Sequence, residues 1–142
     1  MVKSFLLAAV IAATALIARA PVAAADVVAK ISIAQQTMNV YVDGELTYTW
    51  AVSTGRKGYE TPRGQYRAQW LDALHLSSLY ENAPMPHSVF FSGGYAIHGT
   101  YEVRNLGRPA SHGCVRLSPG HAAALYALVE EQGVGATRVV IR

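Results

Sequence analysis

Cysteine is scarce in this sequence: its 142 residues include one, Cys114. A single cysteine cannot form a disulfide within the chain, and it cannot build the paired-cysteine motifs that bind zinc. Cysteines of exported proteins usually occur in disulfide pairs. Cys114 is therefore buried and inert, bonded to another chain, or used chemically, and only its surroundings can separate these alternatives.

The excess of positive over negative charge is small, and long apolar runs are also scarce. The chain carries a formal net charge of +3, of which Lys3 and Arg19 supply +2, so residues 26–142 carry +1. No lysine- or arginine-rich cluster occurs in the sequence, and we expect no nucleic-acid partner. After residue 25 no apolar run reaches the roughly 20 residues of a membrane-spanning helix, and we expect no membrane association there.

The first 25 residues have the order of a secretory signal. A positive charge at Lys3 precedes an apolar run over residues 5–17, and small residues follow up to Ala25. We predict cleavage after Ala25, export to the periplasm or cell envelope, and one domain over residues 26–142. An N-terminal anchor that stays uncleaved is the alternative, although Arg19 and Pro21 interrupt the apolar run.

Short strand-forming segments separated by turn residues dominate residues 26–142. The strongest turn signal is Asp43-Gly44, because both residues tolerate the positive φ of a tight hairpin turn. Expected strands cover residues 27–33, 37–42, 47–52, 65–70, 88–91, 95–98 and 137–141. Glycine, proline and asparagine predict loops or irregular structure over residues 53–64, 71–86 and 99–112.

One clear helix is predicted near the C-terminus. Ser118 can cap it, Pro119 fits its first turn, and Gly133 can end it. Leu125 and Val129 fall on one face of this helix. The predicted fold class is mostly β, a sandwich or open barrel, with this one main α-helix.

Cys114 lies in the segment S-H-G-C-V-R-L, between a glycine-containing loop and the predicted helix. A thiol is mostly protonated at neutral pH, so a nucleophilic cysteine needs a base or a cationic neighbour. His112 and His98 are the candidates. We assign His98 as the base because it ends a predicted strand and is held more rigidly, with His112 in a supporting role. Amides around Gly113 and Cys114 are candidates for an oxyanion hole.

Two other interpretations of these residues remain open. A single buried cysteine is often inert packing. His98, His112 and Cys114 are also suitable zinc ligands, but the spacings typical of zinc motifs are absent, and we assign no metal and no cofactor. Side chains expected along the substrate cleft, where they would form a lid that excludes water, are Tyr80, Met85, His87 and Phe91. For Tyr80 and Phe91, plain core packing is an equal alternative.

The motifs together resemble a known family. I-H-G-T at residues 97–100 and L-G-R-P-A-S-H-G-C-V-R-L at residues 106–117 look like the catalytic signature of the L,D-transpeptidases, the YkuD-like domain. V-S-T-G at residues 52–55 and T-P-R-G at residues 61–64 resemble two further motifs of that family. The resemblance covers nearly all of residues 26–142.

The resemblance implies roles for individual residues. Cys114 is the expected nucleophile and His98 the expected base, oriented by the backbone carbonyl of Gly99. Ser111, His112 and Gly113 are expected to complete the acyl site. Arg116 is the cation usual after the cysteine, and it either acts on the reacting groups or anchors the loop.

The resemblance also implies a function in cell wall biogenesis and cell shape. The cysteine would attack the third residue of a peptidoglycan tetrapeptide stem, and a second stem or a wall-attached lipoprotein would resolve the acyl-enzyme. The alternatives are an L,D-carboxypeptidase or hydrolase of the same fold, and a non-catalytic wall-binding domain. Acylation by β-lactams, notably carbapenems, is a further expectation from the family.

Overall fold

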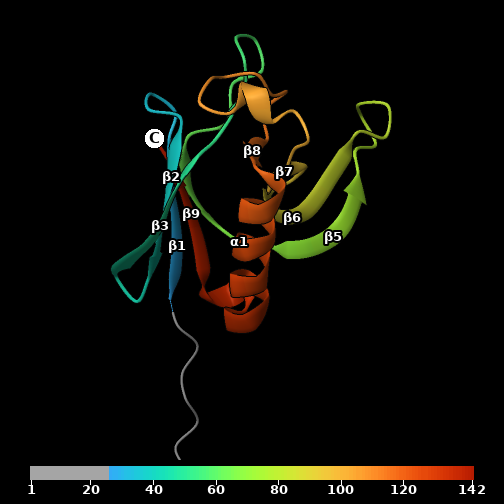
Figure 1. Ribbon diagram of the computed structural model, residues 1–142. Helices are drawn as coiled ribbons and strands as arrows, with labels where there is room; N and C mark the ends of the chain where they lie inside the picture. The colour runs from blue at the N-terminus through green and yellow to red at the C-terminus, as the bar shows by residue number, and fades with distance from the viewer. Residues whose placement is uncertain (1–25) are drawn as a thin grey trace, which may run out of the picture.

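The computed structural model describes residues 26–142, so the predicted signal segment lies outside the described residues. Two β-sheets and one long helix make up this part of the chain (Figure 1). The first sheet has the strand order β3-β2-β1-β9-β4. Its strands are β1 (Val27–Ser32), β2 (Thr37–Val42), β3 (Glu45–Ala51), β4 (Gly64–Arg67) and β9 (Thr137–Ile141). Because β1 and β9 pair in parallel, the first and last strands of the described chain are neighbours in this sheet, with Val27 opposite Thr137 at one end and Ile31 opposite Ile141 at the other.

The second sheet has the order β5-β6-β7-β8. Its strands are β5 (Trp70–Leu76), β6 (Pro84–Ser92), β7 (Tyr95–Gly99) and β8 (Val115–Leu117). β5, β6 and β7 are antiparallel neighbours, whereas β7 and β8 pair in parallel. The connection from β7 to β8 contains the short helix η1 (Val103–Asn105).

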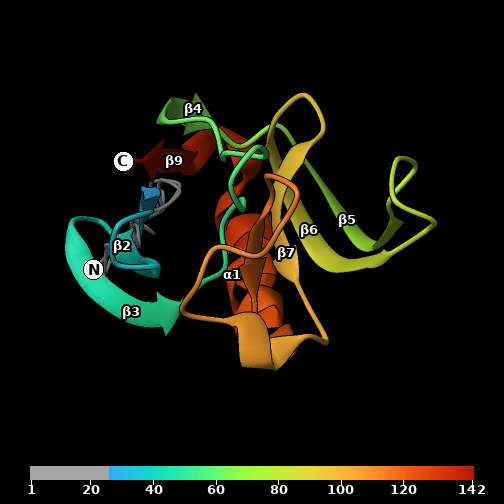
Figure 2. The ribbon, with the colours of Figure 1, turned by 90° about the horizontal axis from the view of Figure 1, so that it is seen from above.

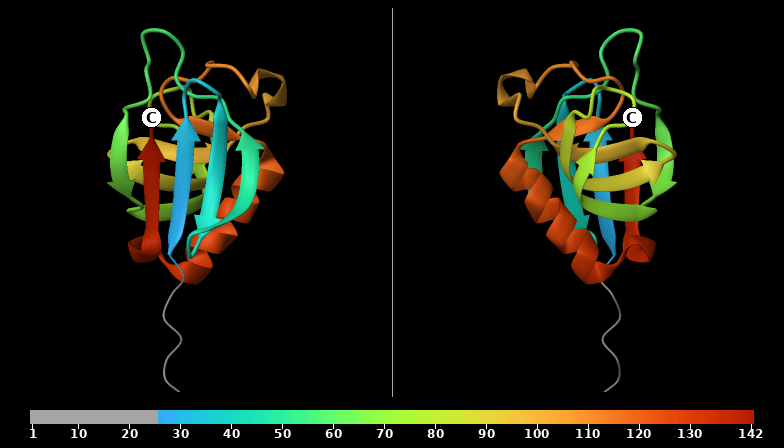
Figure 3. Two further views of the ribbon diagram at one scale, coloured as in Figure 1. Left: turned by 90° about the vertical axis from the view of Figure 1, so that its left-hand side faces the viewer. Right: turned by 90° about the vertical axis from the view of Figure 1, so that its right-hand side faces the viewer.

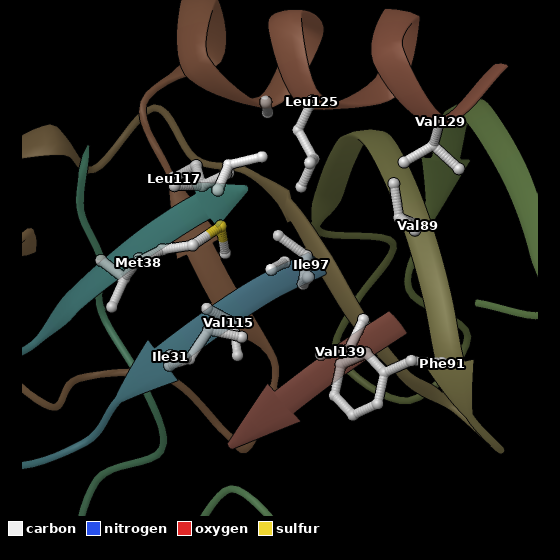
Figure 4. Packing of buried hydrophobic residues seen from close by; sticks show 14 of the residues in the cluster. Ile31, Met38, Val89, Phe91, Ile97, Val115, Leu117, Leu125, Val129 and Val139 are labelled. Atoms are coloured by element: carbon white, nitrogen blue, oxygen red, sulfur yellow. The ribbon is translucent and has the colours of Figure 1, made fainter. Parts of the chain in front are cut away.

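Helix α1 (Pro119–Gln132) lies between the two sheets (Figures 1 and 2). The Ser118 side chain caps it by accepting from the His121 N–H at 3.3 Å, and Gly133 ends it with φ of 93°. Its buried residues Leu125 and Val129 face the core between the sheets (Figure 4). A second short helix, η2 (Val134–Ala136), leads into β9.

The structure confirms the predicted fold class and most predicted elements. The hairpin turn at Asp43-Gly44 has φ of 49° and 82°, as that dipeptide predicts. The C-terminal helix and the final strand also form where we expected them. Within residues 26–142, no helix is long and apolar enough to span a membrane.

The prediction of an irregular stretch over residues 71–86 is wrong. β5 and β6 form a hairpin there, in which Pro84 pairs with Leu76 and Pro86 with Leu74. β6 pairs with β7 only from Val89 onward. The two prolines therefore lie where β6 has a neighbouring strand on one side only. Their missing N–H groups cost no hydrogen bond between strands on the side that has no neighbour.

Candidate active site

Strand register brings the candidate site residues to one face of the second sheet. His98 of β7 pairs with Arg116 of β8, and Ile97 pairs with Val115. Ile97 and Val115 are buried in the main core. Because side chains alternate along a strand, His98 and Arg116 project away from that core. Cys114 directly precedes β8 and lies on the same side as Arg116, two residues away.

A cavity of about 830 Å³ opens on this face, and His98, Cys114 and Arg116 all line the cavity. One wall is the hairpin of β5 and β6, and another is the segment from residue 100 to residue 102. The Cys114 side chain is partly exposed to the cavity and packs on a small apolar cluster beneath it, made of Met85, Phe90 and Ala96. A nucleophile and a base candidate therefore share one accessible pocket.

His98 is held as a neutral imidazole. Its Nδ1 donates to the carbonyl oxygen of Gly99 at 2.7 Å, which leaves Nε2 as the acceptor. The pKa of His98 is lowered to about 4, mainly by burial and with a smaller contribution from the positive charge of Arg116, while the hydrogen bond to Gly99 opposes the shift. At neutral pH this imidazole can accept a proton.

Cys114 is held as a thiol in this structure. Burial raises the pKa of the Cys114 thiol, while a hydrogen bond from the Ala96 backbone and the charge of Arg116 partly oppose the rise. The sulfur lies 3.8 Å from the carbonyl oxygen of Gly94, to which it donates. The resting site thus holds a thiol and a neutral imidazole in one cavity, and proton transfer has to accompany attack.

His112 has a different environment from His98. Its Nε2 accepts from the Arg56 guanidinium at 3.1 Å, because arginine can only donate. The ring stacks on Tyr80, with 4.2 Å between centroids, and meets the edge of Tyr59 at 4.9 Å. Desolvation and the charge of Arg56 both lower the pKa of His112. With Nε2 occupied and the ring held by two tyrosines, His112 fits a structural part of the site better than a base.

The loop before Cys114 is fixed by hydrogen bonds from three sequence motifs. Ser111 Oγ donates to the carbonyl of Cys114 at 2.6 Å and accepts from the N–H of Gly113 at 3.0 Å. Thr61 Oγ1 donates to the carbonyl of Gly113 at 2.8 Å and accepts from the N–H of Gly55 at 2.9 Å. The Gly113 amide, expected as an oxyanion donor, is therefore already used inside the loop.

Gly113 is required sterically as well as conformationally. Its φ is 121°, a region that residues with a side chain rarely adopt, and a Cβ here would lie 2.7 Å from a ring carbon of Tyr95. Glycine thus lets the loop pass close to Tyr95 immediately before the cysteine.

Arg116 bridges the cavity floor and the β7–β8 connection. Its Nη1 lies 3.3 Å from Oε2 of Glu102, and its side chain is 19% exposed. Its charge lowers the pKa of Cys114 and also that of His98. Both interpretations from the sequence, an electrostatic role and a loop anchor, are compatible with this position.

The predicted cleft residues divide into two pairs. Tyr80 and Met85 line the cavity. His87 does not: its ring lies against Tyr126 of α1, at 5.3 Å. Phe91 does not either, because it is 1% exposed and points into the main core (Figure 4). Its neighbour Phe90 lines the cavity instead, since adjacent residues of a strand face opposite sides.

Sequence reasoning missed part of the cavity wall. Trp70 stacks on Phe90 with 3.7 Å between ring centroids, and His75 also lines the cavity. His75 Nδ1 contacts Asp72 at 3.0 Å. Trp70, the aromatic residue that begins β5, was the sequence signal for this wall, but β5 itself was not predicted. Among residues 26–142, no group of three or more His, Cys, Asp or Glu side chains is arranged to hold a metal ion.

Comparison with known proteins supplies an independent line of evidence. A family model described as the L,D-transpeptidase catalytic domain (YkuD) matches residues 26–141. No curated protein sequence gives a significant match.

Similar solved structures carry the same family description. An L,D-transpeptidase from Mycobacterium smegmatis is 28% identical, with a TM-score of 0.73 over 83% of this chain and 59% of that chain. An L,D-transpeptidase from Xylanimonas cellulosilytica is 30% identical, with a TM-score of 0.70 over 86% and 63%. L,D-transpeptidase 3 from Mycobacterium tuberculosis, in complex with a faropenem-derived adduct, is 22% identical, with a TM-score of 0.73 over 83% and 60%, and shows the fold alone. The chain thus spans less than two thirds of the length of these structures.

Proposed function

Because this chain belongs to the family of L,D-transpeptidase catalytic domains, we propose that it transfers acyl groups between peptidoglycan stem peptides through a thioester on Cys114. The observation that carries the proposal is the pairing in one cavity of a partly exposed thiol with an imidazole whose Nδ1 is tied to Gly99. A neutral base beside a protonated thiol is the state from which acylation can start.

In the first half-reaction, His98 Nε2 takes the proton of the Cys114 thiol as the sulfur attacks the carbonyl carbon of the third stem residue. The C–S bond forms, and the C–N bond to the terminal D-alanine breaks. The imidazolium of His98 then gives its proton to the departing amine. Arg116 supports the step, because its positive charge favours the developing thiolate.

In the second half-reaction, an amine of another stem attacks the thioester carbonyl and passes a proton to His98 Nε2. A new C–N bond replaces the C–S bond, and His98 returns the proton to the sulfur. The product is a cross-link between third residues. Attack by water would make the enzyme a hydrolase, and attack by an amine of a lipoprotein would attach protein to the wall.

We also propose that residues 1–25 are the secretory signal and that the enzyme works in the periplasm or cell envelope. The order of charge, apolar run and small residues supports this proposal. A substrate in the cell wall is consistent with export.

Product analysis tests the proposed function. Purified disaccharide–tetrapeptides are incubated with the wild-type chain and with Cys114→Ala, and products are identified by mass. We expect a dimer that has lost one D-alanine from wild type alone. A shortened monomer would establish the hydrolase instead, and no product from wild type would favour the wall-binding domain.

A further inference from the structure

The outer face of the five-stranded sheet gathers cations from segments far apart in the sequence. Lys30 of β1 pairs with Val140 of β9, and Arg67 of β4 pairs with Arg138 of β9. Paired residues project to the same side of a sheet, and alternate residues of a strand share a side. Lys30, Arg67, Arg138 and Arg142 therefore occupy one face, and all four are exposed.

This face is uncovered within the described part of the chain. The opposite side of β1 and β9 carries Ala29, Ile31, Val139 and Ile141, which are buried in the main core. Figure 3 (left) shows β9, β1, β2 and β3 toward the viewer, with α1 behind them. The cationic face thus points away from both the helix and the second sheet.

A hollow of about 390 Å³ lies on this face. Its charged lining residues are Lys30, Arg138, Arg142 and one acid, Asp26, which together carry +2. All of residues 26–142 together carry only +1. The hollow therefore concentrates positive charge that the remainder of the domain does not share, and none of its lining residues belongs to the active-site cavity.

The cations of this face have different partners. Arg67 stands opposite Arg138 across β4 and β9, but its Nη1 donates to the carbonyl of Gly135 and it does not line the hollow. Asp26 meets Arg138 at 3.2 Å and offsets only part of the positive charge of the hollow. The ammonium of Lys30 lies 4.7 Å above the Tyr41 ring, which holds it at the edge of the hollow.

We propose that this cationic face binds strands of peptidoglycan through the carboxylates of their peptides. The separate active-site cavity carries out the chemistry. The inference rests on the proposed function, because it takes the partner to be the polymer that supplies the substrate. Guanidinium groups bind carboxylates through paired hydrogen bonds. The floor of the hollow is formed by Val28 and Val140, which do not protrude as membrane anchors do. A polar polymer fits this surface better than a lipid bilayer.

Co-sedimentation of the full chain with insoluble peptidoglycan tests the proposal. The test variant is Lys30→Gln with Arg142→Gln, and the matched control is Lys57→Gln with Arg104→Gln. Both remove two exposed positive charges, but the control residues lie outside the hollow and the cavity. We expect about tenfold weaker binding for the test variant and wild-type binding for the control at low ionic strength. Thermal unfolding and β-lactam acylation of Cys114 check that both variants are folded.

Two further arms identify the partner. Converting the carboxylates of the peptidoglycan to amides should weaken binding of wild type to the level of the test variant. Equal binding by both variants, or undiminished binding to the amidated polymer, would overturn the proposal. The proposal would also be overturned if the test variant lost binding to anionic phospholipid vesicles but kept its binding to peptidoglycan. Wall binding through this face without any cross-linked product would refute the proposed function and leave this inference standing.

Discussion

His98 and Gly99 are adjacent in sequence, and the Nδ1 of the first donates to the carbonyl oxygen of the second at 2.7 Å. The bond fixes the ring and its tautomer, so that Nε2 is the free acceptor. His112, two residues before the cysteine, has its Nε2 occupied by Arg56 instead. His98 can therefore accept a proton at Nε2, whereas Nε2 of His112 already accepts a hydrogen bond.

The first prediction follows from this difference. His98→Gln should slow acylation of Cys114 by a carbapenem by at least about 100-fold, because the general base is lost. His112→Gln, the matched control, should stay within about tenfold of wild type, since that ring supports the loop. Intact-mass time courses measure both rates. A larger loss in His112→Gln than in His98→Gln would reverse the assignment of the base.

Stability should depend on pH through His98. Its folded pKa is about 4, below the roughly 6.5 of an unfolded histidine. As the pH falls, the unfolded chain binds this proton first. The stability contributed by the neutral ring is therefore complete above about pH 6.5 and is lost progressively toward pH 4, by up to roughly 3 kcal/mol.

Urea unfolding at pH 7 and pH 4.5 measures this effect. His98→Gln cannot bind the proton, so its free energy of unfolding should fall less over the same interval. The same pH dependence in wild type and variant would show that other groups cause the loss.

Arg116 should lower the pKa of the Cys114 thiol, as the structure indicates. In Arg116→Gln the midpoint of thiol ionisation should move to higher pH, whereas Arg116→Lys keeps the charge and should move it less. The pH dependence of alkylation by iodoacetamide reports this midpoint. If both variants lose stability and neither midpoint moves, Arg116 acts as a loop anchor through Glu102.

Gly113→Ala should destabilise the protein and disturb the active-site loop. The new Cβ would lie 2.7 Å from the Tyr95 ring, at a backbone φ of 121°. Gly107→Ala is the matched control, because its φ is 93° and no atom lies near its Cβ position. We expect a loss of about 1 kcal/mol for the control and about 3 kcal/mol for Gly113→Ala. Equal losses in chemical denaturation would mean that Tyr95 moves aside freely.

Tyr80→Ala should loosen the tip of the β5–β6 hairpin. Tyr80 stacks on His112 with 14° between the ring planes, and such a pair contributes about 1 kcal/mol. Amide hydrogen exchange over residues 77–83 should therefore accelerate several-fold. Leu79→Ala, which changes a neighbouring side chain that is 78% exposed, should leave exchange unchanged. Equal acceleration in both variants would place the cause in the hairpin itself.

Local chemistry was sufficient for much of the fold and for the candidate site. Asp43-Gly44 predicts its hairpin, and Ser118 and Gly133 predict the two ends of α1, because turns and caps depend on a few adjacent residues. The motifs around His98 and Cys114 likewise indicated one family, since their residues are close in sequence.

Only the tertiary structure decided which side chains meet. β8 has three residues, too few for a periodic pattern, and its parallel pairing with β7 puts Arg116 opposite His98. Pairing with β5 stabilises β6 despite its two prolines and turns Phe90, rather than Phe91, toward the cavity. The cations of the outer sheet face form no run in the sequence, because they come from three strands that only the sheet aligns. Strand pairing between distant segments is a long-range interaction, which local sequence patterns do not encode.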